Sequence, residues 1–269
     1  MRDPAERDKD AQAERVHAGS QGAGGPWAHD VAKIAGTDGE RDHQRRVRVS
    51  YDSVTNAYVA RVHGELVHKP LDRALLTAFA EQVPAAFGPG ASVCDAGCGP
   101  GHVGAFLADH GLAVTGIDLS PAMIARAREL HPELTFEVGT MTALAAGDER
   151  WQGLIAFYSL IHLTSDAELR AALREFHRTL ADGGLLLVAV HLGEHGDATV
   201  HADDMLGVSV DMEFRFFAAE QLAAEVAAAG FTVVAQLVRA PYPDVEVQTM
   251  RLYLLAQRVG ESPAFPADG

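Results

Sequence analysis

The sequence predicts an α/β fold in which a largely parallel sheet carries helices on both faces. Three observations support this prediction. From residue 92 onward, short apolar runs typical of buried strands alternate with segments of helical periodicity. A glycine-rich turn, "GCGPG" at 97–101, joins the first apolar run to the first of these helices. The last two apolar runs are separated only by "APYPD", which leaves no room for a helix and predicts an antiparallel hairpin.

The order of these segments predicts a sheet of seven strands that ends in the hairpin. Strands are expected at residues 93–96, 112–118, 134–138, 154–159, 185–191, 231–239 and 245–257. Helices are expected at residues 101–110, 121–130, 166–180 and 218–229. The third helix runs into "DGG" at 182–184, a common stop signal because glycine readily adopts the left-handed conformation at a helix end.

The chain is expected to divide into four parts. Residues 1–46 have mixed charge, a "GSQGAGG" stretch and few large apolar side chains, which together predict disorder. Residues 47–90 show near-helical spacing of leucines and aromatics around a proline helix start, and predict a helical lid. Residues 91–258 form the core with the sheet, and residues 259–269 a flexible tail.

Composition restricts the classes of partner. A formal net charge of −15 disfavours binding to nucleic acid and to anionic lipid surfaces. The first ten residues, "MRDPAERDKD", lack the apolar core of a secretory signal, and the run "LLLVAV" is far shorter than the ~20 residues of a membrane span. We therefore expect a cytoplasmic protein with neither a nucleic-acid nor a membrane partner. Its oligomeric state, monomer or homodimer, stays open.

The glycine-rich turn is compatible with two kinds of ligand. "GPGHVG" at 99–104 fits the fingerprint of a dinucleotide site, and Asp118 ends the next strand, where its carboxylate can bind ribose hydroxyls. Asp95, however, stands at the end of the first strand and would repel a pyrophosphate. A nucleoside with a cationic amino-acid head and no phosphate is instead attracted by Asp95. S-adenosylmethionine is such a ligand.

From Tyr51 to Gln257 the chain resembles the class I S-adenosylmethionine-dependent methyltransferases of the small-molecule type. The resemblance rests on "VCDAGCGPG" at 93–101, on "VTGIDLSPAMIARAR" at 114–128 and on the closing hairpin. It implies a Rossmann-like seven-stranded sheet with a terminal antiparallel hairpin and an N-terminal helical lid. It also implies S-adenosylmethionine as the cofactor and a small molecule as the methyl acceptor.

The resemblance further implies a set of cofactor-binding residues. They are Tyr51, Asp95, Gly97, Gly99, Gly101, Asp118, Leu119, Met123, Thr140, Met141, Tyr158 and Ser159. Some have simpler alternatives: the two methionines could be ordinary core residues, and the first tyrosine an ordinary contact between lid and core. Lys69 could pair with the cofactor's carboxylate, or could simply be a solvated cation at a helix start.

Two histidines are candidate catalytic residues. His162 follows the fourth predicted strand and His191 ends the fifth, at the sheet edge where open α/β folds bind ligands. An imidazole with its unperturbed pKa of about 6.5 can accept a proton near neutral pH. We expect His191 to be a base and His162 to be a neighbour of the cofactor. Alternatively, both are polar residues at strand ends without a role in proton transfer.

The acceptor-binding residues are expected in an insertion at 201–222, which lines the acceptor pocket in the enzymes that the chain resembles. Met205, Asp211, Phe214 and Arg215 combine apolar walls with charge, as a small organic acceptor requires. The alternative is that the aromatic side chains only pack the insertion onto the sheet.

No metal site is predicted. "HLGEH" at 191–195 matches the H-x-x-E-H spacing of a group of zinc proteases, but that motif needs a helix. Here it follows an apolar strand and is flanked by glycines, which indicates a strand running into a loop.

The sequence as a whole predicts methyl transfer to a small molecule, at oxygen rather than nitrogen, in the manner of natural-product tailoring. Two alternatives stay open: an NAD-dependent oxidoreductase, and a non-catalytic protein that binds S-adenosylmethionine.

Overall fold

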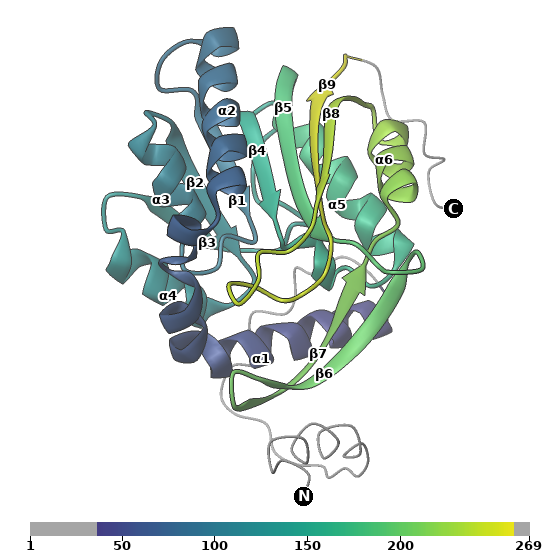
Figure 1. Cartoon of the computed structure of the whole chain (residues 1–269). Coiled ribbons are helices and arrows are strands. Elements are labelled where there is room, and N and C mark those ends of the chain that lie inside the picture. Colours follow the sequence, from purple (N-terminus) through teal and green to yellow (C-terminus); the bar gives the residue numbers. More distant parts are fainter. Residues whose placement is uncertain (1–36, 261–269) are drawn as a thin grey trace, which may run out of the picture. The chain divides into compact units, whose positions relative to one another are not determined.

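A seven-stranded sheet organises residues 37–260, the part of the chain that the computed structural model describes (Figure 1). Its strand order is β3-β2-β1-β4-β5-β9-β8. The strands are β1 (Ser92–Ala96), β2 (Ala113–Asp118), β3 (Thr135–Val138), β4 (Trp151–Phe157), β5 (Leu180–His191), β8 (Phe231–Arg239) and β9 (Arg251–Arg258). Strands β1 to β5 are parallel, whereas β9 is antiparallel to both β5 and β8. The predicted sheet and its closing hairpin are confirmed.

Helices cover both faces of the sheet, as Figure 1 shows. They are α2 (Pro70–Phe87), α3 (His102–Asp109), α4 (Pro121–Leu130), α5 (Asp166–Thr179) and α6 (Ala219–Ala228). Successive strand residues point to opposite faces, so Leu154 of β4 packs in the cluster with α5 and α6, and Ile155 in the cluster with α2 and α3. The central strands are therefore apolar on both sides, as the sequence indicated.

A separate layer lies across the carboxyl ends of the central strands (Figure 1). It consists of helix α1 (Asp38–Val62) and a two-stranded hairpin of β6 (Ala198–Met205) and β7 (Val208–Phe216), with the short 3₁₀ helix η3 (Glu65–His68) leading to α2. Val47 and Val54 of α1 pack on Val210 and Met212 of β7. This apolar contact joins two segments that are far apart in the sequence.

Helix α1 differs from the expectation at its start. It begins at Asp38, so residues 38–46, which were predicted to be disordered, are helical. Thr37 and Glu40 form a capping box, and His43 and Gln44 are buried. The capping box is a local signal that was overlooked, whereas His43 and Gln44 are held by contacts with His162 and Glu168, which local composition does not reveal. Residues 1–36 and 261–269 lie outside the described residues, so their predicted disorder stays a prediction.

Four further segments differ from the expectation. The insertion after β5, for which no strand was predicted, is the β6–β7 hairpin. The alternation of apolar residues in 208–214 is typical of a strand, so the signal was present in the sequence. The last strand begins at Arg251 rather than at 245, because residues 240–250 form a loop. The "DGG" segment lies inside β5, where a register shift opposite Trp151 and Gly153 accommodates it. Helix α2, expected in the lid, instead packs Phe79 on the sheet.

The glycine before α3 has a strict packing requirement. Gly101 has φ +82°, and a Cβ there would lie 2.6 Å from the ring of Phe136. Gly111 has a similar φ of +89° but no neighbouring atom within 4 Å. Gly101→Ala is therefore expected to cost about 2–4 kcal/mol of folding free energy, against about 1–2 kcal/mol for Gly111→Ala, which carries the backbone strain alone. Urea unfolding of both variants measures the difference, and equal losses would contradict the packing argument.

Candidate active site

A first cleft opens at the carboxyl ends of β1, β2 and β4, beneath α1. It lies between the strand ends and the lid, and its cavity volume is about 100 Å³. The sequence-predicted residues that line it are Tyr51, Asp95, Gly97, Gly99, Asp118, Leu119, Met123, Thr140, Met141, Tyr158, Ser159 and His162. Gly101 is not in the lining, since its role is to let α3 pack closely on Phe136. The structure thus brings the implied cofactor residues together around one cleft.

Two buried carboxylates define the electrostatics of this cleft. Burial, and then the negative charge of Asp118, raise the pKa of Asp95 to about 7. Burial raises the pKa of Asp118 to about 6, although the backbone N–H groups of Ser120 and Gly99 each donate to its carboxylate at 2.8 Å. Oδ2 of Asp95 has no hydrogen-bond partner among residues 37–260. A backbone hydrogen bond from Gly104 also lowers the pKa of Asp95, but burial outweighs it. A cleft with two buried carboxylates and one unpartnered carboxylate oxygen favours a cationic ligand.

The glycine-rich turn shapes the floor of the cleft. Gly97 has φ +80°, and a Cβ there would lie 2.3 Å from Cβ of Ser159. Gly99 has φ +52° and donates its N–H to Asp118. These left-handed residues reverse the chain between β1 and α3, so that bare backbone faces the cleft.

Helix α1, which covers the cleft, is hydrogen-bonded to the segments on both sides of it. On one side, the Tyr51 hydroxyl lies 2.8 Å from Nε2 of His162, and Nε2 of His43 lies 2.9 Å from the carbonyl oxygen of His162. On the other side, Asp52 accepts from the Ser120 hydroxyl at 2.6 Å, at the start of α4. Tyr51 therefore lies over the cleft in a fixed position.

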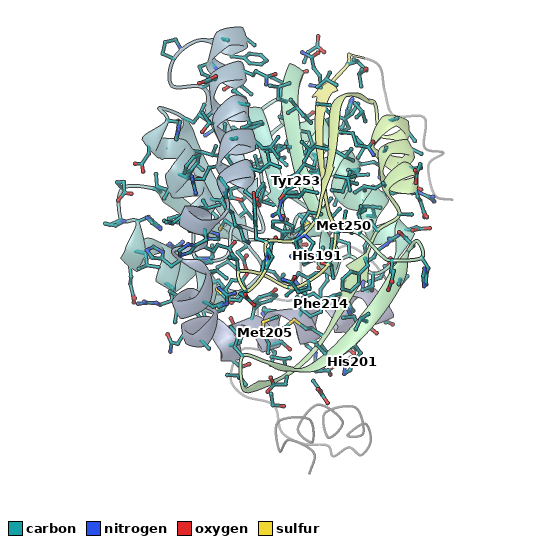
Figure 2. All side chains as sticks on the ribbon, viewed as in Figure 1. His191, His201, Met205, Phe214, Met250 and Tyr253 are labelled. Atoms are coloured by element: carbon teal, nitrogen blue, oxygen red, sulfur yellow. The ribbon has the colours of Figure 1, made fainter. Side chains whose placement is uncertain are left out.

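A second cavity of about 380 Å³ adjoins the first, between the β6–β7 hairpin and the seven-stranded sheet. The two cavities share six lining residues: Tyr51, Tyr58, His102, Val103, Phe157 and Tyr158. Of the predicted acceptor residues, Met205, Phe214 and Arg215 line the second cavity, together with His191. In Figure 2, Met205, Phe214 and His191 lie between the hairpin and the sheet, whereas His201 is at the hairpin's outer edge.

Asp211 does not line either cavity. It is one of the outward-facing residues of β7, with 61% of its side chain exposed, and lies 3.6 Å from Nε of Arg46. No strand was predicted at 201–222, so the sequence analysis assigned no face to Asp211; in β7 it alternates with the buried Val210 and Met212 and points outward. Arg215 faces inward but is paired with Asp197 at 2.5 Å and Asp166 at 2.6 Å, which leaves it a mainly structural cation.

The two predicted catalytic histidines are both in surroundings that disfavour protonation. Burial, and then the cation Arg251, lower the pKa of His191 to about 3. Its Nδ1 lies 2.7 Å from the Thr249 hydroxyl. Burial lowers the pKa of His162 to about 4. Since a general base works best with a pKa near the working pH, neither ring has the expected basicity. The base role of His191 stays a prediction that its environment argues against.

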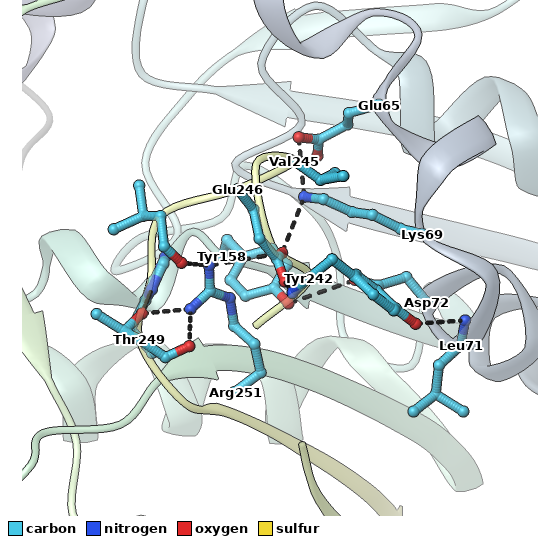
Figure 3. Close-up of polar contacts among 12 residues, drawn as sticks. Glu65, Lys69, Leu71, Asp72, Tyr158, Tyr242, Val245, Glu246, Thr249 and Arg251 are labelled. Atoms are coloured by element: carbon cyan, nitrogen blue, oxygen red, sulfur yellow. Dashed lines mark hydrogen bonds and ion pairs between the residues drawn. The ribbon is translucent and has the colours of Figure 1, made fainter. Parts of the chain in front are cut away.

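The second cavity has a charged wall that the sequence did not reveal (Figure 3). Lys69 is buried, with Nζ 2.9 Å from Glu65 and 3.5 Å from Glu246. It is therefore neither a solvated cation nor free for the cofactor's carboxylate. Arg251 lies 3.5 Å from Glu246 and, like Lys69, faces the ring of Tyr158. Glu65, Lys69, Glu246 and Arg251 come from three segments of the chain.

No metal site is evident in the part of the chain that the structure describes. Residues 37–260 contain no group of three or more histidine, cysteine, aspartate and glutamate side chains placed to bind an ion. "HLGEH" begins at the end of β5 and continues outside any helix, so its two histidines do not share a helical face.

The cleft fits S-adenosylmethionine on the chemistry of its residues. The unpartnered carboxylate oxygen of Asp95 can accept from an ammonium group, and Asp118 still has lone pairs for ribose hydroxyls. A pyrophosphate placed on the same turn would meet two carboxylates. The described residues therefore suit a cationic nucleoside better than a dinucleotide.

Comparisons with known proteins agree with this geometry. Residues 93–184 match the methyltransferase domain family. The malonyl-[acyl-carrier protein] O-methyltransferase of Serratia marcescens is 31% identical over 161 residues, which cover 58% of this chain and 60% of that protein. The dTDP-3-amino-3,6-dideoxy-alpha-D-glucopyranose N,N-dimethyltransferase of Streptomyces fradiae is 35% identical over 99 residues, 36% of this chain and 38% of that protein. The chain thus spans less than two thirds of either relative.

A solved structure matches over a longer range. The 1,6-didemethyltoxoflavin-N1-methyltransferase of Burkholderia thailandensis, bound to its acceptor and S-adenosylhomocysteine, has a TM-score of 0.62 at 20% identity. The match covers 84% of this chain and 92% of that one, and at this identity it shows the shared fold. The matching domain at 93–184, the similar relatives and the shared fold together support a class I S-adenosylmethionine-dependent methyltransferase.

Proposed function

We propose that this chain transfers the methyl group of S-adenosylmethionine to an oxygen of a small organic acceptor, as a tailoring step in natural-product synthesis. The observation that carries the proposal is the pair of adjoining cavities. One holds the carboxylates Asp95 and Asp118, and the other has an apolar and charged wall. Tyr158 belongs to both linings, which supports transfer at the junction of the two cavities.

The residues of the chain contribute alignment and exclusion of water. S-adenosylmethionine supplies a methyl group that is already activated on a positively charged sulfur. Asp95 binds the cationic head, and Asp118 binds the ribose. Tyr51 and Tyr58 of α1 cover the cleft from the lid, with their rings in an edge contact at 5.6 Å. Fixing two reactants in line can supply about 7–11 kcal/mol of the barrier without a covalent intermediate.

The acceptor cavity favours oxygen over nitrogen. Lys69 and Arg251 lie in its wall beside Glu65 and Glu246, and each cation lowers the pKa of His191 by more than Glu246 raises it, which supports a positive potential at that ring. Such a potential repels the ammonium form of an amine and stabilises negative charge that develops on an oxygen. The relatives include enzymes named for O-methylation and for N-methylation, so their names alone do not choose between the two.

We also propose that the enzyme works in the cytoplasm on a free small molecule, as a monomer or homodimer. The net charge of −15 supports the absence of a nucleic-acid partner. Among residues 37–260, none of the helices has both the length and the apolar character that crossing a bilayer requires.

The proposed reaction is tested by binding and turnover with the full chain. Calorimetry is expected to show binding of S-adenosylmethionine and none of NADH. Incubation with a panel of phenols, carboxylic acids and amines is expected to release S-adenosylhomocysteine, with methylated oxygen identified by mass spectrometry. Binding of NADH alone would support an oxidoreductase instead. Cofactor binding without turnover of any acceptor in the panel would support a non-catalytic binding protein.

A further inference from the structure

A third histidine occupies the junction of the two cavities. His102, the first residue of α3, lines both of them, directly after the glycine-rich turn. Only 12% of its side chain is exposed. Neither His162 nor His191 belongs to both linings, because the former faces the cofactor cleft and the latter the acceptor cavity. His102 is therefore the described histidine that faces cofactor and acceptor together.

The ring of His102 has a carboxylate on one side and no partner on the other. Nε2 lies 3.6 Å from Oε1 of Glu65, whereas Nδ1 is buried without a hydrogen-bond partner among residues 37–260. A carboxylate beside Nε2 favours the tautomer with the proton on Nε2, which leaves the lone pair on Nδ1. The nitrogen without a partner is thus the one able to accept a proton.

An ion pair with Lys69 fixes the position of the Glu65 carboxylate (Figure 3). Its second oxygen, Oε2, lies 2.9 Å from Nζ of Lys69, which also contacts Glu246. Burial alone would raise the pKa of Glu65, but His102 and Lys69 outweigh burial, and the pKa is lowered. Glu65 is accordingly an anion with one oxygen for Lys69 and one for His102.

This carboxylate matters because of where His102 lies. An imidazolium at the amino end of a helix is disfavoured by the helix dipole. Glu65 opposes that effect through its own charge. At His191, Arg251 and Lys69 each lower the pKa by more than Glu246 raises it. Of the three histidines, His102 is the one with a carboxylate oxygen within 4 Å of a ring nitrogen.

We propose that His102, oriented by Glu65, is the general base of the methyl transfer. The inference rests on the proposed function and names the residue that receives the acceptor's proton. As the acceptor oxygen forms its bond to the methyl carbon, the sulfur–carbon bond breaks and its electron pair stays on sulfur. The proton leaves the acceptor oxygen for Nδ1 of His102. Glu65 stabilises the resulting imidazolium, which then returns the proton to water.

The first test does not depend on an acceptor. NMR of the ring nitrogens identifies the tautomer of His102 in the complex with S-adenosylhomocysteine, in the wild type and in Glu65→Gln. The proton is expected on Nε2 in the wild type, and that preference is expected to be lost when the carboxylate is removed. An unchanged tautomer would show that Glu65 does not act on His102, and would overturn the pair.

The second test uses His102→Gln and the best acceptor of the panel. Turnover is expected to fall by about 10²–10⁴, the usual contribution of a general base, with S-adenosylmethionine affinity within about threefold of the wild type. Glu65→Gln is expected to lower turnover less and to move the acid limb of the rate profile to lower pH. His110→Gln is the matched control, because His110 caps the other end of the same helix, outside both cavities. Thermal unfolding checks that each variant is folded.

Two results would overturn the base role. One is turnover of His102→Gln within about threefold of the wild type. The other is a loss of S-adenosylmethionine affinity with turnover at saturation unchanged, which would make His102 a cofactor ligand. Failure of the wild type to methylate any acceptor would instead overturn the proposed function, and the base role with it.

Discussion

Asp95→Asn is expected to weaken S-adenosylmethionine binding by about 10- to 150-fold, while raising the melting temperature of the free protein. Loss of a charge-assisted hydrogen bond costs about 1.5–3 kcal/mol of binding free energy. In the free protein, however, the same carboxylate is buried with an unpartnered oxygen near Asp118. Replacing the carboxylate by a neutral amide of equal size removes the free-energy cost of burying a charge at this position. Since 1 kcal/mol corresponds to about 2–4 °C in a domain of this size, a rise of several degrees is expected.

The two effects of Asp95→Asn depend on pH in a defined way. Burial raises the folded-state pKa of Asp95 to about 7, above its ordinary value of 3.8. The stability contributed by the protonated carboxyl is thus full below pH 4 and is lost as the pH rises through 7. The gain in melting temperature from Asn is therefore largest at pH 8 and small at pH 4. In the wild type, cofactor affinity should rise with pH through 7, because the ionised form binds the cationic head.

Thermal unfolding and calorimetry at several pH values check these expectations. Asp148→Asn is a suitable control, since Asp148 is a surface residue with 75% of its side chain exposed. It should change neither quantity appreciably. Cofactor affinity within twofold of the wild type in Asp95→Asn would contradict the assignment of this carboxylate to the cationic head.

Glu246→Ala is expected to lower the free energy of unfolding by about 3–5 kcal/mol, the usual cost of leaving buried partner charges uncompensated. Its side chain is 4% exposed and faces three cations. Arg239 donates to both of its oxygens, and Lys69 and Arg251 each lie at 3.5 Å. The melting temperature should fall by roughly 6–20 °C.

The effect of Glu246 also has a pH signature. Burial would raise the pKa of Glu246, but the hydrogen bond from Arg239 and the other contacts prevail and hold the pKa at about 2, below its ordinary value of 4.5. Its contribution is present above pH 4.5 and is lost as the pH falls through 2. Glu149→Ala is the matched control: Glu149 also pairs with an arginine, Arg258, but is 58% exposed. It should cost at most about 1 kcal/mol. Equal losses in both variants would contradict the network.

The cofactor cleft could be predicted from the sequence because its determinants are local. Asp95 and the glycines belong to one strand and the turn after it, and Asp118 ends the next strand. Parallel strands bring their carboxyl ends together, so a single sequence order places both carboxylates at one edge. The structure puts them there, with the backbone of Gly99 bridging to Asp118.

The proximity of His102 to the charged wall of the second cavity could not be predicted in the same way. Glu65 and Lys69 precede the sheet, His102 follows the glycine turn, and Glu246 comes from a loop that was expected to be strand. No local pattern joins these four residues, since their proximity depends on how the lid and the last loop pack. The face that Asp211 occupies was uncertain for a similar reason, because a strand inverts its exposed side with a shift of one residue.

The hydrogen bonds that attach α1 to both sides of the cofactor cleft have a consequence for the rate of turnover. Tyr51 ties the helix to His162 beyond β4, and Asp52 ties it to Ser120 before α4. We expect exchange of spent for fresh cofactor to require that α1 moves and that both attachments break. On that expectation, each catalytic cycle includes an opening step whose rate is independent of the acceptor's reactivity. With a reactive acceptor, a deuterated methyl group should leave the steady-state rate unaltered.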